Sequence, residues 1–164
     1  MEEIVIRPAV REDVGLILRF IHALAVYERE PDAVEATEEA LLTHGFGEKP
    51  YFECVIAECD GAAAGFAFYF FDYSTWLGKP GLYLEDLFVD PEFRGKGVGK
   101  TLLERLAQIA VERGCARMKW EVLDWNEPAI EFYRAMGAEF LDEWRNVRLS
   151  GDALKRLAGM EVAK

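Results

Sequence analysis

The chain has 164 residues, of which 30 are acidic and 19 basic, so its formal net charge is −11. This length suits one well-buried domain rather than two, and we expect a single domain over residues 1–164. The negative charge argues against nucleic acid and anionic membranes as partners and attracts cationic solutes. The longest apolar run, residues 62–71, is about half of what a membrane helix needs.

The N-terminus and the metal-binding residue types exclude further classes. The first residues, MEEIVIRP, lack a basic segment followed by an apolar one, so no secretory signal is visible and we expect a cytoplasmic protein. The three cysteines are odd in number and have no CxxC spacing, which predicts small core residues rather than disulfides or a zinc site. His22 and His44 stand alone, so we expect neither a metal nor histidine-based catalysis.

The first third of the chain reads as a strand followed by two helices. Residues 4–6 are strand-like, and Pro8 ends that strand. From Asp13 to about Glu28, apolar residues recur at i, i+3, i+4 and i+7, which is typical of an amphipathic helix. Thr37 is a plausible N-cap for a second, short helix.

Three strands and a helix are predicted next. The runs 52–58 and 65–73 are strand-like, and the Asp60-Gly61 pair between them predicts a tight hairpin turn. A third strand spans residues 82–89 and ends at Asp90-Pro91. A helical stripe over residues 102–110 should end near Gly114.

The remaining elements complete a mixed pattern. Residues 117–122 read as a strand, Asn126 can cap a helix that ends at Gly137, and a last strand is expected near 143–149, before a short helix from Asp152. The apolar side of the Asn126 helix is expected at four residues: Ala129, Phe132, Tyr133 and Met136. The order β-α-α-β-β-β-α-β-α-β predicts a mixed α/β sheet.

The stretch FRGKGVGKT at residues 93–101 has the composition of a phosphate-binding loop. A nucleotide P-loop, G-x-x-x-x-G-K-[ST], would need glycine where Arg94 stands, and Gly95 lies one residue too close. The pattern [RQ]-x-x-G-x-[GA] instead fits residues 94–99 at every defined place. Glycines let an anion approach the backbone amides, and the following helix adds its positive end. The alternative is a glycine turn that only begins a helix.

This loop resembles the acyl-CoA loop of the GNAT superfamily of N-acetyltransferases. Further motifs are similar to the spermidine/spermine and thialysine N-acetyltransferases: IVIRP at 4–8, LAVYE at 24–28, YLED at 83–86, VLDWNEPA at 122–129 and FYRAMGA at 132–138. The resemblance implies a GNAT fold, a mixed and mostly antiparallel twisted sheet flanked by helices. It also implies acetyl-CoA as co-substrate without a metal, a small cationic amine as acceptor, and a homodimer.

The same resemblance assigns two catalytic roles. Glu85 matches the carboxylate that removes a proton from the incoming amine, and the alternative is a strand carboxylate that faces solvent. Because neighbouring residues of a strand point to opposite faces, we expect only one of Glu85 and Asp86 to line the site, and we favour Glu85. Tyr133 matches the general acid for the leaving CoA sulfur, and the alternative is a core aromatic side chain.

The resemblance also implies binding residues. The segment that pairs with the pantetheine arm is Leu87, Phe88 and Val89, and the Leu87 N–H is a candidate donor to the thioester oxygen. The remaining cofactor-binding residues would be Arg94, Gly95, Lys96, Gly97, Val98, Gly99, Lys100, Asn126, Glu127, Pro128, Ala129 and Tyr133. The amine site would comprise Tyr27, Glu28, Glu85, Lys119, Trp120 and Glu121. Two tryptophans, Trp76 and Trp125, are expected to be packing residues, and the alternative is that they contact the substrate.

The acceptor is less narrowly defined than the reaction. Residues 73–76 read Tyr-Ser-Thr-Trp, where the polyamine enzymes carry Tyr-Asp-Pro-Trp. This chain therefore lacks an acidic residue that would bind a distant second ammonium group of the acceptor. This favours a shorter amine such as thialysine, a lysine-like side chain or a small diamine, although Glu121 restores some acidity. Two alternatives stay open: an acetyltransferase of protein or peptide amines, and a non-catalytic acyl-CoA-binding module.

Overall fold

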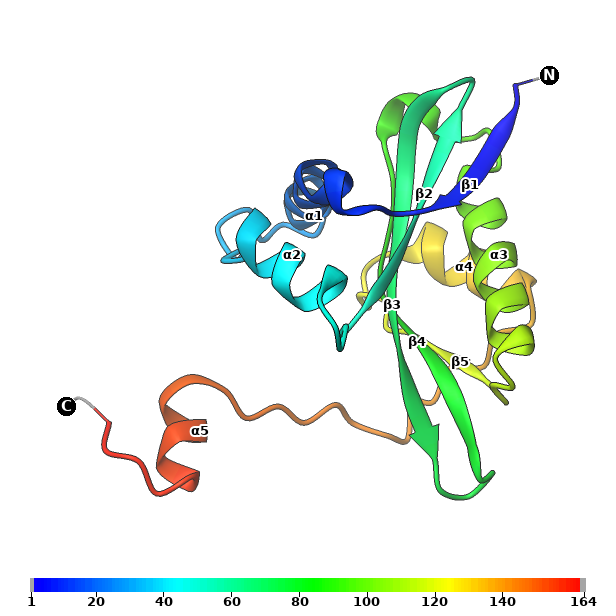
Figure 1. Ribbon diagram of the computed structural model, residues 1–164. Coiled ribbons are helices and arrows are strands. Elements are labelled where there is room, and N and C mark those ends of the chain that lie inside the picture. The colour runs from blue at the N-terminus through cyan, green and yellow to red at the C-terminus, as the bar shows by residue number, and fades with distance from the viewer. Residues whose placement is uncertain (1, 163–164) are drawn as a thin grey trace. The chain divides into compact units, whose positions relative to one another are not determined.

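A five-stranded sheet organises most of the computed structural model, which describes residues 2–162 (Figure 1). The strands lie in the order β1-β2-β3-β4-β5, with β1 to β4 antiparallel and β5 parallel to β4. Their bounds are β1 Ile4–Pro8, β2 Glu53–Cys59, β3 Ala62–Ser74, β4 Lys79–Val89 and β5 Met118–Lys119. The predicted mixed, mostly antiparallel sheet is confirmed.

The helices begin and end close to their predicted caps. They are η1 Arg11–Asp13, α1 Val14–Tyr27, α2 Glu38–Phe46, η2 Pro91–Phe93, α3 Val98–Glu112, α4 Glu127–Ala135 and α5 Gly151–Leu157. The Thr37 hydroxyl accepts the Ala40 N–H at 3.1 Å, as an N-cap should. Gly114 follows α3 with a φ of 75°, the left-handed conformation that ends a helix.

The sheet is covered on both faces. Figure 1 shows α1 and α2 on one side of it and α3 on the other. On the α1 side, Phe20 packs against Phe66 and Phe88 with ring centroids 5.3 and 5.8 Å apart. On the other side, α3 buries Leu102 and Leu106 completely. Cys54 and Cys59 are buried and unbridged, which confirms that they are small core residues.

Two predicted strands need correction. The strand expected over 117–122 is only β5, Met118–Lys119, and the segment 143–149 forms no strand. A strand needs a neighbour for its backbone groups, and within residues 2–162 none pairs with 143–149. Val147 is 92% exposed there.

The packing role expected for Trp76 is also wrong, because that side chain is 89% exposed.

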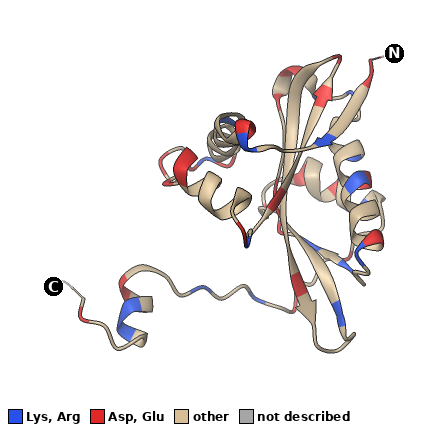
Figure 2. Cartoon of the chain, in the orientation of Figure 1, with Lys and Arg blue, Asp and Glu red and all other residues tan. Residues whose placement is uncertain are grey.

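Contacts within the chain divide it into two compact units, Met1–Leu123 and Asp124–Lys164. The second unit holds α4 and α5. The buried residue of α4 is Ile130, whereas Phe132 and Met136, two of the four residues expected on its apolar side, are more than a third exposed. Acidic and basic residues are interspersed over the helices and strands (Figure 2). Within residues 2–162, no helix has both the length and the apolar character needed to cross a membrane.

Candidate active site

The glycine loop connects η2 to α3 with its backbone open. Gly95 and Gly97 have φ values of 79° and 85°, and a Cβ at either position would meet nothing within 4 Å. Gly97 is the N-cap of α3, and its carbonyl accepts the Thr101 N–H at 3.0 Å and the Thr101 hydroxyl at 2.8 Å. The amides of residues 98–100 precede that first intrahelical bond, so they lie at the positive end of the helix.

The three cations of the loop have different surroundings. Arg94 donates from Nε to the Val89 carbonyl at 3.0 Å, and its guanidinium carbon lies 5.0 Å from the centre of the Tyr27 ring. Arg94 therefore ties the loop to the end of α1. Lys96 pairs with Glu2 at 2.8 Å and Lys100 with Glu104 at 3.9 Å, both at exposed positions. Exposed pairs contribute little, so these two ammonium groups can exchange partners at low cost.

The edge of β4 is open beside this loop. Strand β5 pairs with β4 only through Leu82–Met118 and Tyr83–Lys119. Strand β4 continues to Val89, and in the described part of the chain no strand pairs with that edge beyond Tyr83. The predicted pantetheine segment, residues 87–89, lies on this open stretch. An extended ligand with amide groups can pair there as an added strand would.

A β-bulge places Glu85 and Asp86 together. Asp86 lies opposite Phe68 and Leu84 opposite Tyr69, so Glu85 is the extra residue of β4. Tyr83 lies opposite Phe70, and the two rings stack at 5.1 Å. Phe68 and Phe70 share one face of β3, so Tyr83 and Asp86 share that face too, and Glu85 follows Tyr83 by two residues. The expectation that Glu85 and Asp86 point to opposite faces is wrong, because the bulge interrupts the alternation.

Four carboxyl groups influence one another at the bulge. Burial, with the charges of Glu85 and Glu28, raises the pKa of Asp86 to about 7. The pKa of Glu85 is raised by burial and by Glu121, and that of Glu28 by burial and by Glu85. Glu28 is the C-cap residue of α1, so this helix brings it to the cluster. The result is a negative site whose proton occupancy changes near neutral pH, as suits a general base for an amine.

A second set of polar side chains lies on the same face of the sheet. The Tyr83 hydroxyl donates to Glu121 Oε1 at 3.1 Å, and Lys119 Nζ lies 3.7 Å from Asp72 Oδ2. Of the predicted amine-site residues, the structure thus brings Glu28, Glu85 and Glu121 together, with Lys119 beside Tyr83. Roles for Asp72 and Tyr83 were not expected from the sequence, because the strand pairing that places them leaves no pattern in it. Asp86 was set aside in favour of Glu85, because the sequence does not show the bulge.

The remaining predicted residues belong to the second unit. Asn126 is the N-cap of α4, and its carbonyl accepts the Ile130 N–H at 3.0 Å. Pro128 lies in the first turn, as predicted. Tyr133 is in the last turns of α4, with its ring 5.7 Å from that of Phe132. The roles of Asn126, Glu127, Pro128, Ala129 and Tyr133 remain predictions.

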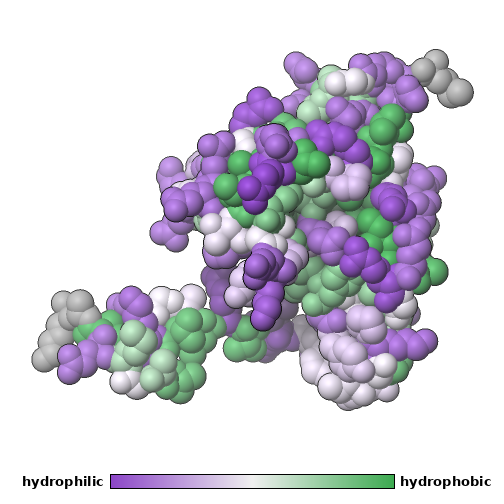
Figure 3. Space-filling model, viewed as in Figure 1, coloured by the Kyte–Doolittle hydropathy of each residue, from purple (hydrophilic) through white to green (hydrophobic). Residues whose placement is uncertain are grey.

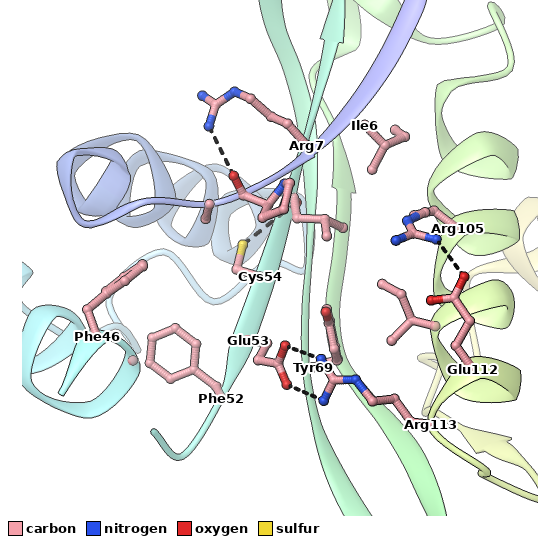
Figure 4. Close-up of a pocket in the computed structure, with 15 residues that line it drawn as sticks. Ile6, Arg7, Phe46, Phe52, Glu53, Cys54, Tyr69, Arg105, Glu112 and Arg113 are labelled. Atoms are coloured by element: carbon pink, nitrogen blue, oxygen red, sulfur yellow. Dashed lines mark hydrogen bonds and ion pairs between the residues drawn. The ribbon is translucent and has the colours of Figure 1, made fainter. Parts of the chain in front are cut away.

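A cavity of about 360 Å³ lies elsewhere in the first unit (Figure 4). It is lined by the end of β1, the start of β2 and the C-terminal half of α3, whereas the glycine loop is at the N-terminal end of α3. Its cations are already paired: Arg113 faces Glu53 with two contacts of 3.1 and 2.9 Å, and Arg105 lies 3.5 Å from Glu112. We therefore do not assign this cavity to the cofactor.

Comparison with known proteins decides the family. Residues 18–138 match the profile of the Acetyltransferase (GNAT) family. The chain belongs to this family. The expected enzyme class, an acetyl-CoA-dependent N-acetyltransferase, is thereby confirmed.

The names of relatives of this GNAT chain refer to different amines. The chain is 41% identical to the thialysine N-epsilon-acetyltransferase of Sus scrofa, over 97% of this chain and 99% of that protein. It is 39% identical to the human spermidine/spermine N(1)-acetyltransferase-like protein 1, over 98% of this chain and 24% of that protein. An integron cassette protein from V. cholerae has the same fold, with a TM-score of 0.78 and 29% identity over 94% of this chain and 97% of that one. The predicted fold and branch are confirmed.

Proposed function

We propose that the chain transfers the acetyl group of acetyl-CoA to the primary amine of a small cationic acceptor, such as thialysine or a diamine, by direct attack in a ternary complex. The observation that carries this proposal is the bulged pair Glu85–Asp86 beside the open edge of β4. An anionic site attracts the ammonium group, and the neighbouring edge can hold the extended arm of the co-substrate.

The cofactor contacts follow from the loop and the strand. Acetyl-CoA supplies an activated thioester, and its diphosphate would bind the amides of residues 95–100 together with Arg94, Lys96 and Lys100. The pantetheine arm would pair with Leu87–Val89, and the Leu87 N–H would donate to the thioester oxygen as it gains negative charge. By the family motif, Asn126 to Ala129 would contribute further contacts to the cofactor.

The proton chemistry follows from the carboxyl cluster. An alkyl ammonium has a pKa of about 10.4, so it must lose a proton before its nitrogen can attack. Glu85 would accept that proton, and Asp86, whose pKa is about 7, would share it. By the family motif, Tyr133 would donate a proton to the departing sulfur, because a thiol has a pKa of about 8.5.

Direct attack also agrees with the state of the cysteines. Burial raises the pKa of the Cys54 thiol, so its nucleophilic thiolate form is disfavoured. Cys59 is likewise buried. Neither belongs to the glycine loop or to the bulge, and the proposal includes no covalent acyl-enzyme.

Two substitutions test the assignment. We expect Glu85→Gln and Tyr133→Phe each to lower kcat/KM by about 10²–10⁴, the usual contribution of general acid or base catalysis, with the affinity for acetyl-CoA nearly unchanged. Glu92→Gln and Tyr51→Phe, at exposed positions, are the matched controls. CoA release measures activity, and titration calorimetry measures cofactor binding.

Each alternative predicts a different result. Acetyl transfer that persists at the wild-type rate in both variants contradicts the catalytic roles. Cofactor binding without turnover of any amine would support the acyl-CoA-binding module. Turnover of peptides, with none of free thialysine or diamines, would instead identify a protein acetyltransferase.

A further inference from the structure

A short charged row extends from the bulge along the exposed end of the sheet. It contains Asp72 of β3, Lys119 of β5 and Glu121 just after β5. Asp72 lies opposite Gly81, Tyr83 lies beside Lys119, and the Tyr83 hydroxyl bonds to Glu121. Tyr83 follows Gly81 by two positions, so the row and the bulge lie on one face of the sheet.

Gly81 fixes the position of the Asp72 carboxylate. A Cβ at residue 81 would collide with Asp72 Oδ1, so this oxygen occupies the space that a side chain there would need. Oδ1 is buried and has no hydrogen-bond partner among the described residues. Oδ2 lies 3.7 Å from Lys119 Nζ, and the side chains of Lys119 and Asp72 are 43% and 25% exposed. A ligand can therefore reach this ion pair from solvent.

The spacing fits a short acceptor. Tyr83 precedes Glu85 by two residues, which is about 7 Å along a strand. A lysine-like side chain spans about 6 Å from its terminal nitrogen to Cα, given bonds of about 1.5 Å. An acceptor with its terminal amine at Glu85 would therefore place its other end beside Lys119 and Glu121.

The charges at that other end suit a zwitterion. An α-amino acid presents a carboxylate and an ammonium there, and both find an opposite charge in Lys119 and in Asp72 or Glu121. A diamine or polyamine presents only an ammonium, which Lys119 repels. Charges that lie a few ångströms apart near a protein surface interact strongly enough to decide between two such acceptors.

We propose that Lys119, with Asp72 and Glu121 beside it, binds the α-carboxylate and α-ammonium of an amino-acid acceptor, so the chain selects the terminal amine of an α-amino acid over a diamine or polyamine. This inference rests on the proposed function, because it takes the amine to react at Glu85. Lys119 acts here as a specificity residue.

The test compares two acceptors that differ only in one carboxylate. These are thialysine and bis(2-aminoethyl) sulfide, the diamine that remains when the α-carboxylate of thialysine is replaced by hydrogen. Wild type should show the higher kcat/KM for thialysine. Lys119→Met should lower that value about 10- to 100-fold, mainly through KM, as expected for losing a hydrogen bond to a charged group. The same variant should raise kcat/KM for the diamine, because it removes the cation that repels the second ammonium.

Three further variants keep the result interpretable. Lys119→Arg retains the cation and should retain the preference for thialysine. Lys119→Glu should raise kcat/KM for the diamine, because an added anion attracts its second ammonium. Lys49→Met removes an exposed lysine of the α2–β2 connection and should alter neither acceptor. Thermal unfolding of each variant checks that the fold is kept.

The outcomes separate this inference from the proposed function. Equal losses for both acceptors in Lys119→Met, or a wild-type preference for the diamine, overturn the role of Lys119 and leave the acetyltransferase assignment standing. Failure of wild type to acetylate either acceptor, or any other small amine, overturns the proposed function and this inference with it.

Discussion

Asp86 carries the carboxyl group whose protonation changes closest to neutral pH. Burial raises its pKa first, and the charges of Glu85 and Glu28 raise it further, to about 7. In the unfolded chain, an aspartate has a pKa of about 3.9. The folded state therefore binds a proton that the unfolded state has already lost between about pH 4 and 7. By linkage, this favours the folded state at low pH, and the contribution is lost as the pH rises through about 7.

We expect Asp86→Asn to stabilise the protein increasingly as the pH rises. Asparagine never becomes charged, so the variant keeps the stability that wild type loses between about pH 4 and 7. The difference in Tm between variant and wild type should grow by several degrees, on the order of 5 °C, over that interval. Scanning fluorimetry measures it, and Glu92→Gln is the exposed control, with a Tm difference independent of pH. A constant difference for Asp86→Asn would contradict the proton assignment.

The residues that could be predicted from the sequence are those whose role is local. Arg94 and the loop glycines follow one another, so their spacing alone indicates an anion site. Glu85 was expected from a motif. Asp72 could not be predicted, because cross-strand register places it. Asp86 was set aside in favour of Glu85, because the sequence does not show the bulge that puts both residues on one face.

At the scale of elements, strands β3 and β4 approach each other closely just before the glycine loop. Gly65 lies opposite Val89, and a Cβ at residue 65 would collide with the backbone carbonyl of Phe88. A backbone group in a sheet cannot move aside without changing the ladder. Gly65 therefore sets the spacing of the strand that leads into the cofactor loop.

Gly65→Ala should lower the free energy of unfolding by about 1–3 kcal/mol, the usual cost of overpacking. The matched control is Gly15→Ala in α1, where the added Cβ meets the end of the flexible Glu38 side chain. That change should be neutral or stabilising by up to about 1 kcal/mol, since alanine is the better helix former. Urea denaturation measures both variants. Equal effects would show that the contact with Phe88 is unimportant.

A helix or strand could be predicted where its local sequence pattern is matched by a packing or pairing neighbour in the fold. The stripe of α3 and the cap at Thr37 are of this kind, since both signals lie within the helix itself. The segment 143–149 was expected to form a strand, but a strand also needs a neighbour, and the described residues provide none. The run 117–122 pairs for two residues only, because β4 and the chain after β5 separate beyond Tyr83.

At the scale of the whole molecule, the second unit exposes many apolar side chains. Figure 3 shows hydrophobic surface over the segment that holds α5. The exposed large apolar residues after residue 140 are Leu141, Trp144, Val147, Leu149, Leu154, Leu157 and Met160. Exposed apolar patches often mark surfaces that another chain covers. This supports the homodimer implied by the family resemblance, which we propose as the state in solution.

Sedimentation should therefore give about twice the chain mass of 18.6 kDa. The double variant Trp144→Glu, Val147→Asp should sediment as a monomer, because burying two carboxylates in an interface costs several kcal/mol. Glu139→Gln and Arg145→Gln, which are exposed and polar, should leave the dimer intact. A wild-type chain that stays monomeric at about 100 μM would contradict the proposal.

Because Glu85 is the extra residue of the bulge, the loss of its codon alone would remove this side chain without breaking the pairing of β3 with β4. Deleting that codon would restore an uninterrupted ladder between β3 and β4 and remove the carboxylate at once, while the glycine loop downstream would keep its sequence. A descendant gene of this kind would keep Asp86 opposite Phe68 but would lack Glu85, the residue that we propose as the base. Among homologous sequences, the residue count between Tyr83 and the loop would therefore show whether this bulge is kept.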